Sequence, residues 1–144
     1  MDLIIGGAYQ GKCTFAAEKY RLTAADICDL AADAPAPARC YVHLEALTRR
    51  GQAAEALPLL LAAEVVVARE IGSGVVPIDA GERAWRERHG RLLRQLAESA
   101  GHVYRVFCGL TEELKATDPL LWTSRMNNIL HSAEEIVLSK MVYN

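Results

Sequence analysis

The feature that most constrains this chain is a glycine-rich turn close to its N-terminus. Residues 2–6 are a short apolar run after Asp2 that ends at glycine, and residues 12–20 contain neither Gly nor Pro. Such segments predict a strand followed by a helix. The string GGAYQGKCT at residues 6–14 joins them and matches the pattern G-x-x-x-x-G-K. The sequence therefore predicts a phosphate-binding loop between a strand and a helix.

The predicted loop supplies the groups that bind nucleotide phosphates. Its glycines let backbone N–H groups turn towards the phosphates, the helix N-terminus adds positive potential, and Lys12 reaches the terminal phosphates. A glycine-rich turn without a ligand is the alternative, since such turns are common in α/β proteins. We expect ATP or GTP to bind with Mg²⁺ at Gly6, Gly7, Ala8, Tyr9, Gln10, Gly11, Lys12, Cys13 and Thr14.

The residue after the lysine departs from the usual pattern, because Cys13 stands where Ser or Thr normally binds Mg²⁺. A neutral thiol is a poor ligand for a hard cation. Either Thr14 or water replaces it as magnesium ligand, or metal-dependent catalysis is weakened. A second candidate ligand is Glu70, which ends an apolar run at the position where open parallel sheets bind ligands. The glycines that follow Glu70 also fit an ordinary turn.

Strands and helices are expected to alternate along the chain. Asp79 is the expected N-cap of a long helix, and Gly101 is expected to end that helix in the left-handed conformation. This alternation predicts an α/β fold with a mainly parallel sheet covered by helices on both faces. Strands are expected at residues 2–6, 25–30, 64–69 and 102–108, with no strand after residue 111, and helices at residues 12–20, 40–49, 53–62, 79–100 and 119–142.

Size and charge narrow the classes of function. The 144 residues are enough for one domain with a core. A net charge of −2 gives no overall basic field, so no nucleic-acid partner is expected. No apolar run approaches the roughly 20 residues of a membrane span, and no CxxC pair occurs among the four cysteines. We expect a soluble, cytoplasmic protein with reduced thiols and no membrane partner.

Three landmarks together resemble one enzyme family. They are GGAYQGK near the N-terminus, EIGSGVVP at residues 70–77, and GERAWRERHGRLLRQLAESAGHVYRVFCGL at residues 81–110. In this order they resemble the adenosylcobinamide kinase/adenosylcobinamide-phosphate guanylyltransferase family of cobalamin biosynthesis, over residues 1 to about 109. The resemblance implies a P-loop nucleotide-binding fold, phosphorylation of a cobinamide hydroxyl, and transfer of GMP from GTP through a histidine. It matches Gly6, Gly7, Gly11 and Lys12 to the nucleotide loop, and Glu70, Gly72, Gly74 and Pro77 to a second motif.

The chain lacks the segment resembling H-H-x-x-R-P that supplies the guanylylated histidine in this family. The intervening region holds only His43, within YVHLEAL, which we expect to be helical. An isolated histidine at a helical position is usually a packing or surface residue. We also expect structural roles for His89, on the apolar side of its helix, and for His102, at the start of a strand. A covalent guanylyl-histidine is therefore not expected, and transfer of GMP to the phosphate stays open beside the kinase activity. Lys12 and Glu70 are the candidate catalytic residues.

The C-terminal segment has a different resemblance. LTEELKATDPLLWTSRMNNILHSAEEIVLSKMVYN, at residues 110–144, is similar to the C-terminus of the transposon-encoded TnpV family. We therefore expect a nucleotide-binding domain at residues 1–109 and a helical extension at residues 110–144. The apolar stripe of the extension must be buried on the domain or against a second copy of the chain, which favours a homo-oligomer.

Taken together, these patterns predict a cobalamin-pathway kinase. It would use ATP or GTP with Mg²⁺ to phosphorylate adenosylcobinamide or a related corrinoid. Two alternatives stay open. One is a nucleotide-binding protein without turnover, which Cys13 and the missing histidine segment favour. The other is a transposon-associated protein that acts through its C-terminal helix.

Overall fold

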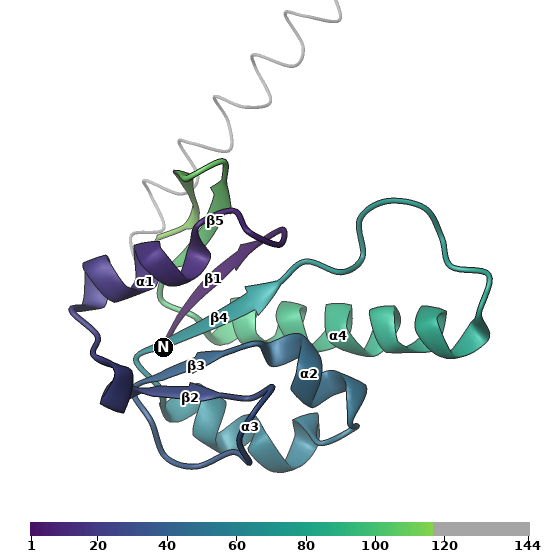
Figure 1. Ribbon diagram of the computed structural model, residues 1–144, viewed down its shortest axis with the longest axis horizontal. Coiled ribbons are helices and arrows are strands. Elements are labelled where there is room, and N and C mark those ends of the chain that lie inside the picture. The colour runs from purple at the N-terminus through teal and green to yellow at the C-terminus, as the bar shows by residue number, and fades with distance from the viewer. Residues whose placement is uncertain (117–144) are drawn as a thin grey trace, which may run out of the picture.

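The computed structural model describes residues 1–116 and has an α/β fold (Figure 1). In the described residues, six strands form one sheet in the order β2-β3-β4-β1-β5-β6. All neighbouring strands pair in parallel except β5 and β6, which are antiparallel. The predicted α/β fold with a mainly parallel sheet is confirmed. The elements are β1 Asp2–Gly6, α1 Lys12–Tyr20, the 3-10 turn η1 Ala24–Asp26, β2 Ile27–Asp29, β3 Cys40–Val42, α2 Leu44–Arg49, α3 Ala53–Ala62, β4 Val65–Arg69, α4 Ala80–Ser99, β5 Val103–Phe107 and β6 Leu110–Lys115.

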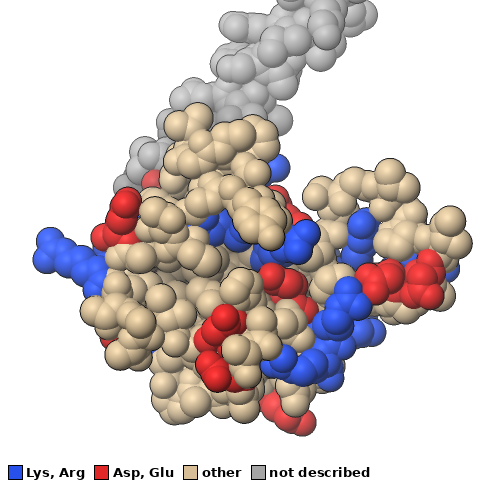
Figure 2. All heavy atoms as spheres, in the orientation of Figure 1, with Lys and Arg blue, Asp and Glu red and all other residues tan. Residues whose placement is uncertain are grey.

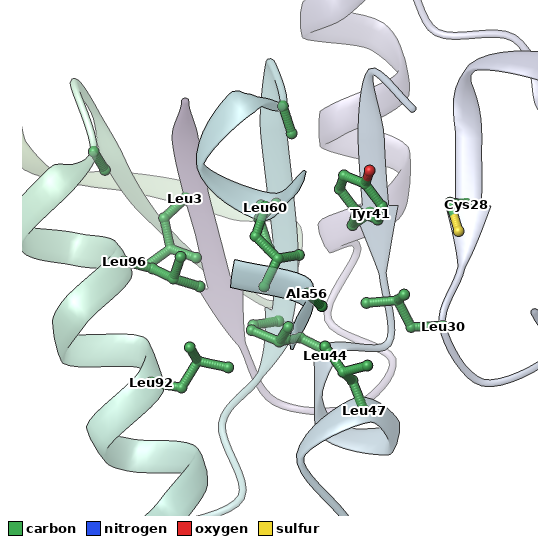
Figure 3. Close-up of a cluster of buried hydrophobic side chains, with 14 of the residues drawn as sticks. Leu3, Cys28, Leu30, Tyr41, Leu44, Leu47, Ala56, Leu60, Leu92 and Leu96 are labelled. Carbon is green, nitrogen blue, oxygen red and sulfur yellow. The ribbon is translucent and has the colours of Figure 1, made fainter. Parts of the chain in front are cut away.

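Helices cover both faces of the sheet. Side chains alternate along β1, so that Leu3 packs with residues of α2, α3 and α4, whereas Ile4 packs with residues of α1. Figure 3 shows the larger of these two clusters, in which Leu60 and Leu96 lie close to Leu3. The central strand β4 is buried from Val65 to Ala68, as expected for a parallel strand between two helical layers. The middle of the sheet is therefore an apolar core.

The prediction of one helix over residues 40–49 is wrong at its start. Cys40–Val42 form β3, all three residues are buried, and the helix α2 begins only at Leu44. Residues Cys40 and Tyr41 pair with β4, and their side chains pack on opposite faces of the sheet. Pairing with a neighbouring strand therefore decides the conformation of a run too short to show its own period.

The prediction that residues 102–108 form the last strand is also wrong. β6 follows β5 through a tight turn and pairs with it from Leu110 to Lys115. Its end is tied to α4, because the Lys115 ammonium donates to the carbonyls of Ala97 and Glu98 at 2.8 and 2.9 Å. The sheet therefore continues beyond residue 109. The predicted helix at residues 119–142 lies outside the described residues.

The long helix α4 begins as predicted and ends differently. The Asp79 carboxylate accepts a hydrogen bond from the Glu82 N–H at 2.8 Å, which confirms the predicted N-cap. At the other end Ala100 is extended, with φ −70° and ψ 144°. Gly101 does not adopt the predicted left-handed conformation, because its N–H pairs at once with the Met1 carbonyl at 3.0 Å.

Candidate functional site

The glycine loop, residues 6–11, joins β1 to α1 at the edge of the sheet where the parallel strands end, here called the carboxyl edge (Figure 1). Glycine is required at its two ends for different reasons. A Cβ on Gly6 would lie 2.4 Å from the Val106 carbonyl oxygen, so no side chain fits there. Gly11, which precedes α1, has φ 98°, in the left-handed region that favours glycine. The local sequence thus fixes a tight turn onto the start of the helix.

A second turn supports the glycine loop from the side. The backbone N–H of Cys108 donates to the Gln10 side-chain oxygen at 2.6 Å, and the N–H of Gly109 donates to the Gln10 carbonyl at 2.9 Å. Cys108 and Gly109 form the turn between β5 and β6, and both have positive φ. The hairpin of β5 and β6 therefore braces the loop, a contact between segments about a hundred residues apart that the sequence pattern did not reveal.

A pocket of about 620 Å³ opens beside the glycine loop at the carboxyl edge, and is called the loop pocket below. Figure 2 shows basic and acidic side chains together in the middle of this face, beside the projecting loop that joins β4 to α4. The pocket brings together residues from β1–α1, from the start of α2 and from β4. Its lining residues are Ala8, Tyr9, Gln10, Gly11, Lys12, Cys13, Thr14, His43, Glu45, Val67 and Arg69.

Lys12 is the first residue of α1 and lines the loop pocket. Its ammonium donates to the Gly7 carbonyl, so the side chain folds back over its own loop. Burial lowers the pKa of Lys12, while the nearby carboxylates of Glu45 and Glu70 oppose that shift. A partly buried ammonium close to a turn of backbone N–H groups attracts an anion more strongly than one in bulk water.

Cys13 is the first residue after Lys12 and has a raised pKa. Burial is the largest cause, and the positive charge of Lys12 works against it. The thiol is therefore protonated at neutral pH and is a poor ligand for Mg²⁺. Thr14, the next residue, also lines the loop pocket and carries a hydroxyl oxygen.

Sequence reasoning missed three residues of the loop pocket, namely His43, Glu45 and Arg69. His43 is not within a helix, as predicted, but follows β3 with φ 58° and ψ 46° and precedes α2. Glu45 accepts a hydrogen bond from the Arg69 N–H at 3.3 Å, which links α2 to the end of β4. The available signal was the buried run CYV directly before His43, which has the same form as the apolar run before the glycine loop.

Glu70 is held close to the glycine loop by its backbone but lies outside the lining of the loop pocket. Its N–H donates to the Gly6 carbonyl at 2.9 Å, whereas its side chain lies 3.7 Å from the Arg105 guanidinium. The side chain belongs to a smaller hollow against α4. The two residues predicted to hold magnesium, Thr14 and Glu70, therefore line different hollows, and within residues 1–116 no three metal-binding side chains cluster.

The remaining histidines have the structural positions that the sequence predicts. His89 is 1% exposed, and its ring nitrogens contact the Thr48 hydroxyl at 3.0 Å and the Arg69 carbonyl at 2.8 Å. Burial is the largest influence on His89 and lowers its pKa. His102 lies at the opposite edge of the sheet, where its Nδ1 is 2.9 Å from the Glu113 carboxylate.

The fold and the loop pocket define an α/β protein with a mainly parallel sheet and a polar site at its carboxyl edge. A family model for cobinamide kinase / cobinamide phosphate guanyltransferase matches residues 39–114, more than half of the chain. The chain belongs to this family, whose enzymes act in cobalamin biosynthesis. No curated protein matches it. The match contains His43, Glu45, Glu70 and β6 as far as Leu114, but it does not contain the glycine loop. Among the described residues, no helix has the length and apolarity to cross a lipid bilayer.

Proposed function

We propose that this chain is a nucleotide-dependent kinase that phosphorylates the hydroxyl group of adenosylcobinamide or a closely related corrinoid. The observation that carries the proposal is the glycine loop with Lys12, at the edge of the loop pocket, in a chain of the cobinamide kinase / cobinamide phosphate guanyltransferase family. The family description supplies the substrate class, and the loop supplies the groups that hold a nucleoside triphosphate.

Phosphoryl transfer depends mainly on holding the reacting groups in line and on neutralising charge. The backbone N–H groups of residues 7–11 and the start of α1 would hold the phosphates of ATP or GTP, with Lys12 at the terminal phosphates. Arg69, which ends β4 and lines the loop pocket, would add a second positive charge. Lys12 and Arg69 together would offset the negative charge of a triphosphate beside Glu45.

The oxygen ligands that the described residues offer are too few to hold Mg²⁺ by themselves, so we propose that the ion binds together with the nucleotide phosphates. Thr14 offers a hydroxyl oxygen in the loop pocket, and Glu70, which lines a different hollow, offers a carboxylate. We propose that Thr14 contacts the metal directly and that Glu70 contacts it through water. Bound magnesium would neutralise phosphate charge. The residues of the chain itself would bind and orient the triphosphate around it.

The loop between β4 and α4 offers a surface for a large organic substrate. It projects away from the sheet at the carboxyl edge (Figure 1). Val75, Val76 and Ile78 on this loop are 89%, 70% and 96% exposed. Exposed apolar side chains grouped beside a pocket are typical of binding surfaces. We propose that they contact the corrinoid ring while the hydroxyl group enters the loop pocket.

Isothermal titration with ATP, GTP and cobinamide, followed by a phosphorylation assay on the same sample, tests the proposal. We expect one nucleotide to bind and phosphate to be transferred to cobinamide. Failure of both nucleotides to bind would remove the proposal. Incubation with labelled GTP, followed by a search for an acid-labile adduct, tests guanylyl transfer, and we expect no histidine-linked GMP at stoichiometric level.

A second candidate function is nucleotide binding without turnover, which the protonated thiol of Cys13 favours. The variant Cys13→Ser separates the two candidates, because a hydroxyl is a better magnesium ligand than a thiol. If the wild type is a kinase, Cys13→Ser keeps or raises the rate of phosphoryl transfer. If the wild type only binds nucleotide, the substitution either creates turnover or leaves binding alone.

A further inference from the structure

Two residues at the carboxyl edge form a histidine–carboxylate pair that the proposed nucleotide site does not use. The Nδ1 atom of His43 lies 2.7 Å from Oδ1 of Asp29. Asp29 ends β2 and His43 follows the neighbouring strand β3, so the parallel pairing of these strands brings the two residues together. The pair is therefore built into the sheet and does not depend on a chance meeting of surface side chains.

The carboxylate of Asp29 is fixed and ionised. Burial raises its pKa, but hydrogen bonds from His43 and from the backbone of Ala31 and Ala32 outweigh burial, so the net shift is downward. The same oxygen that faces His43 accepts from the Ala31 N–H at 2.9 Å. A carboxylate held in this way requires the hydrogen on Nδ1 of a neutral His43 ring, which leaves the lone pair on Nε2.

His43 lines the loop pocket together with the glycine loop. About half of its side chain is exposed, so a substrate group can approach the ring. The charged groups at this site are of both signs, because two basic side chains, one carboxylate and one thiol line the loop pocket and a second carboxylate contacts His43. These groups are Lys12 and Cys13 of α1, Asp29 of β2, Glu45 of α2 and Arg69 of β4.

We propose that His43 is the general base of phosphoryl transfer and that Asp29 positions it, an inference that rests on the proposed kinase function. As the substrate hydroxyl oxygen forms its bond to the terminal phosphorus, its proton passes to Nε2 of His43. The bond between that phosphorus and the bridging oxygen breaks, and the nucleoside diphosphate leaves with the electron pair. Asp29 stabilises the imidazolium, which afterwards releases the proton to water.

The left-handed backbone at residue 43 accepts glycine or asparagine, so His43 can be replaced without strain on the fold. Glycine adopts φ 58° without strain and asparagine tolerates it better than most residues. His43→Gly and His43→Asn should therefore keep the fold, as thermal melting would show. His102→Gln is the matched control, because it alters the histidine–carboxylate pair at the opposite edge of the sheet, which is partly buried and lies outside the loop pocket.

The decisive measurement is phosphorylation of cobinamide by the full chain. We expect His43→Gly to lower kcat about a hundredfold or more while nucleotide binding is unchanged. Free imidazole should restore part of the rate, since the open pocket admits it and a defect of folding would not respond. His43→Asn should lose the rate as well, because an amide does not accept the proton of the hydroxyl group. Asp29→Asn should lower kcat while the KM for cobinamide is unchanged, because Asp29 holds the ring and does not line the loop pocket.

The outcomes distinguish this inference from the proposed function. A wild type that binds nucleotide but transfers no phosphate overturns the kinase proposal, and the inference with it. A wild type that phosphorylates cobinamide while His43→Gly keeps the wild-type rate overturns the assignment of His43 as general base and leaves the kinase proposal standing. Loss of activity without rescue by imidazole, or a GMP adduct on His43, also overturns the assignment of His43 as general base.

Discussion

The two edges of the sheet are built in different ways. At the carboxyl edge, Tyr9, His43 and Cys108 have positive φ. Tyr9 and His43 line the loop pocket, and the turn at Cys108 bonds to the glycine loop. At the opposite, amino edge, Asp2 joins distant parts of the chain, because its carboxylate accepts from the Tyr20 hydroxyl at 2.6 Å and from the His102 N–H at 3.1 Å. Both edges must satisfy the backbone groups that parallel strands leave free. The amino edge does so through hydrogen bonds between distant segments, whereas the carboxyl edge combines such bonds with turns of positive φ beside the loop pocket.

The pairs of histidine and carboxylate follow the same division. The His43–Asp29 pair lies at the carboxyl edge and lines a pocket, whereas the His102–Glu113 pair lies at the amino edge and joins β5 to β6. The same chemical groups therefore lie in different surroundings at the two edges. This difference predicts that substitutions at the amino edge change the stability of the fold, and that substitutions at the carboxyl edge change the binding of ligands.

The largest expected effect comes from removing β6, which the amino edge needs. A chain ending at residue 109 loses the pairing of β5 with β6, the Lys115 contacts with α4 and the His102–Glu113 pair. We expect a loss of about 4 kcal/mol or more, enough to make this chain insoluble or largely unfolded. A chain ending at residue 116 should fold and bind nucleotide. Thermal melting and light scattering compare the two.

This comparison also tests the boundary expected between residues 109 and 110. The strand pairing favours a boundary after residue 116, and we propose that position for the end of the nucleotide-binding domain. If the chain ending at residue 109 melts like the one ending at residue 116, the earlier boundary is correct and β6 is dispensable. An unchanged oligomeric state after removal of residues 117–144 would argue against assembly through the C-terminal segment.

The second largest effect is expected for Asp2→Ala. The substitution removes two hydrogen bonds to a charged acceptor and leaves the Tyr20 hydroxyl and the His102 N–H without it. We expect a loss of about 2 kcal/mol in the free energy of unfolding. Nucleotide affinity should stay within twofold or so of the wild type, since Asp2 lies at the far edge from the loop pocket. Urea unfolding measures the loss, with the exposed Asp33→Ala as control.

The sequence predicted the parts of the fold that repeat over many residues. The apolar runs of β1 and β4 and the long amphipathic α4 show their period directly. β3 has three residues and β6 is LTEELK, a polar sequence that is a strand only because it pairs with β5. The strand conformation of β3 and β6 depends on pairing with β4 and β5, respectively. A single sequence does not show those partners.

The candidate site divides in the same manner. The glycine loop is local, so its residues and the position of Lys12 at the pocket could be predicted from one short string. His43 and Asp29 meet only because β2 and β3 are neighbours in the sheet, and β3 was not predicted. Glu70 ends its strand as expected, yet the salt bridge that orients it comes from Arg105 on β5. Whether Glu70 serves a metal stays a prediction.

At the carboxyl edge, Lys12→Ala should change binding and leave stability unchanged. The substitution removes the ammonium that folds over the glycine loop. We expect a loss of about 1 kcal/mol or more in the binding of ATP or GTP, which is roughly a fivefold weaker affinity or worse. Lys19→Ala, near the other end of α1, is the control and should bind nucleotide normally. Equal affinities of Lys12→Ala and the wild type would remove the phosphate-binding role of the loop.

The smallest effect concerns acid, and it should loosen the carboxyl edge first. His89 lies beneath this edge, donates from Nε2 to the Arg69 carbonyl, and contacts Thr48 of α2. Burial holds its pKa below the 6.5 of an unfolded chain, so the folded protein binds fewer protons than the unfolded one as the pH falls through that range. The contribution of neutral His89 to the free energy of unfolding is therefore fully present above pH 6.5 and decreases as the pH falls below it.

The variant His89→Gln isolates this contribution. It removes the titrating group while keeping a side-chain donor near the Arg69 carbonyl, so its melting temperature should decrease less than that of the wild type on going below pH 6.5. Hydrogen exchange should find the acid-dependent loss of protection at the end of β4 and in α2, because these are the segments that His89 joins. Equal pH dependence in wild type and His89→Gln would show that His89 is not the cause of the acid effect. A loss of protection that begins around Asp2 would show that the amino edge responds to acid first.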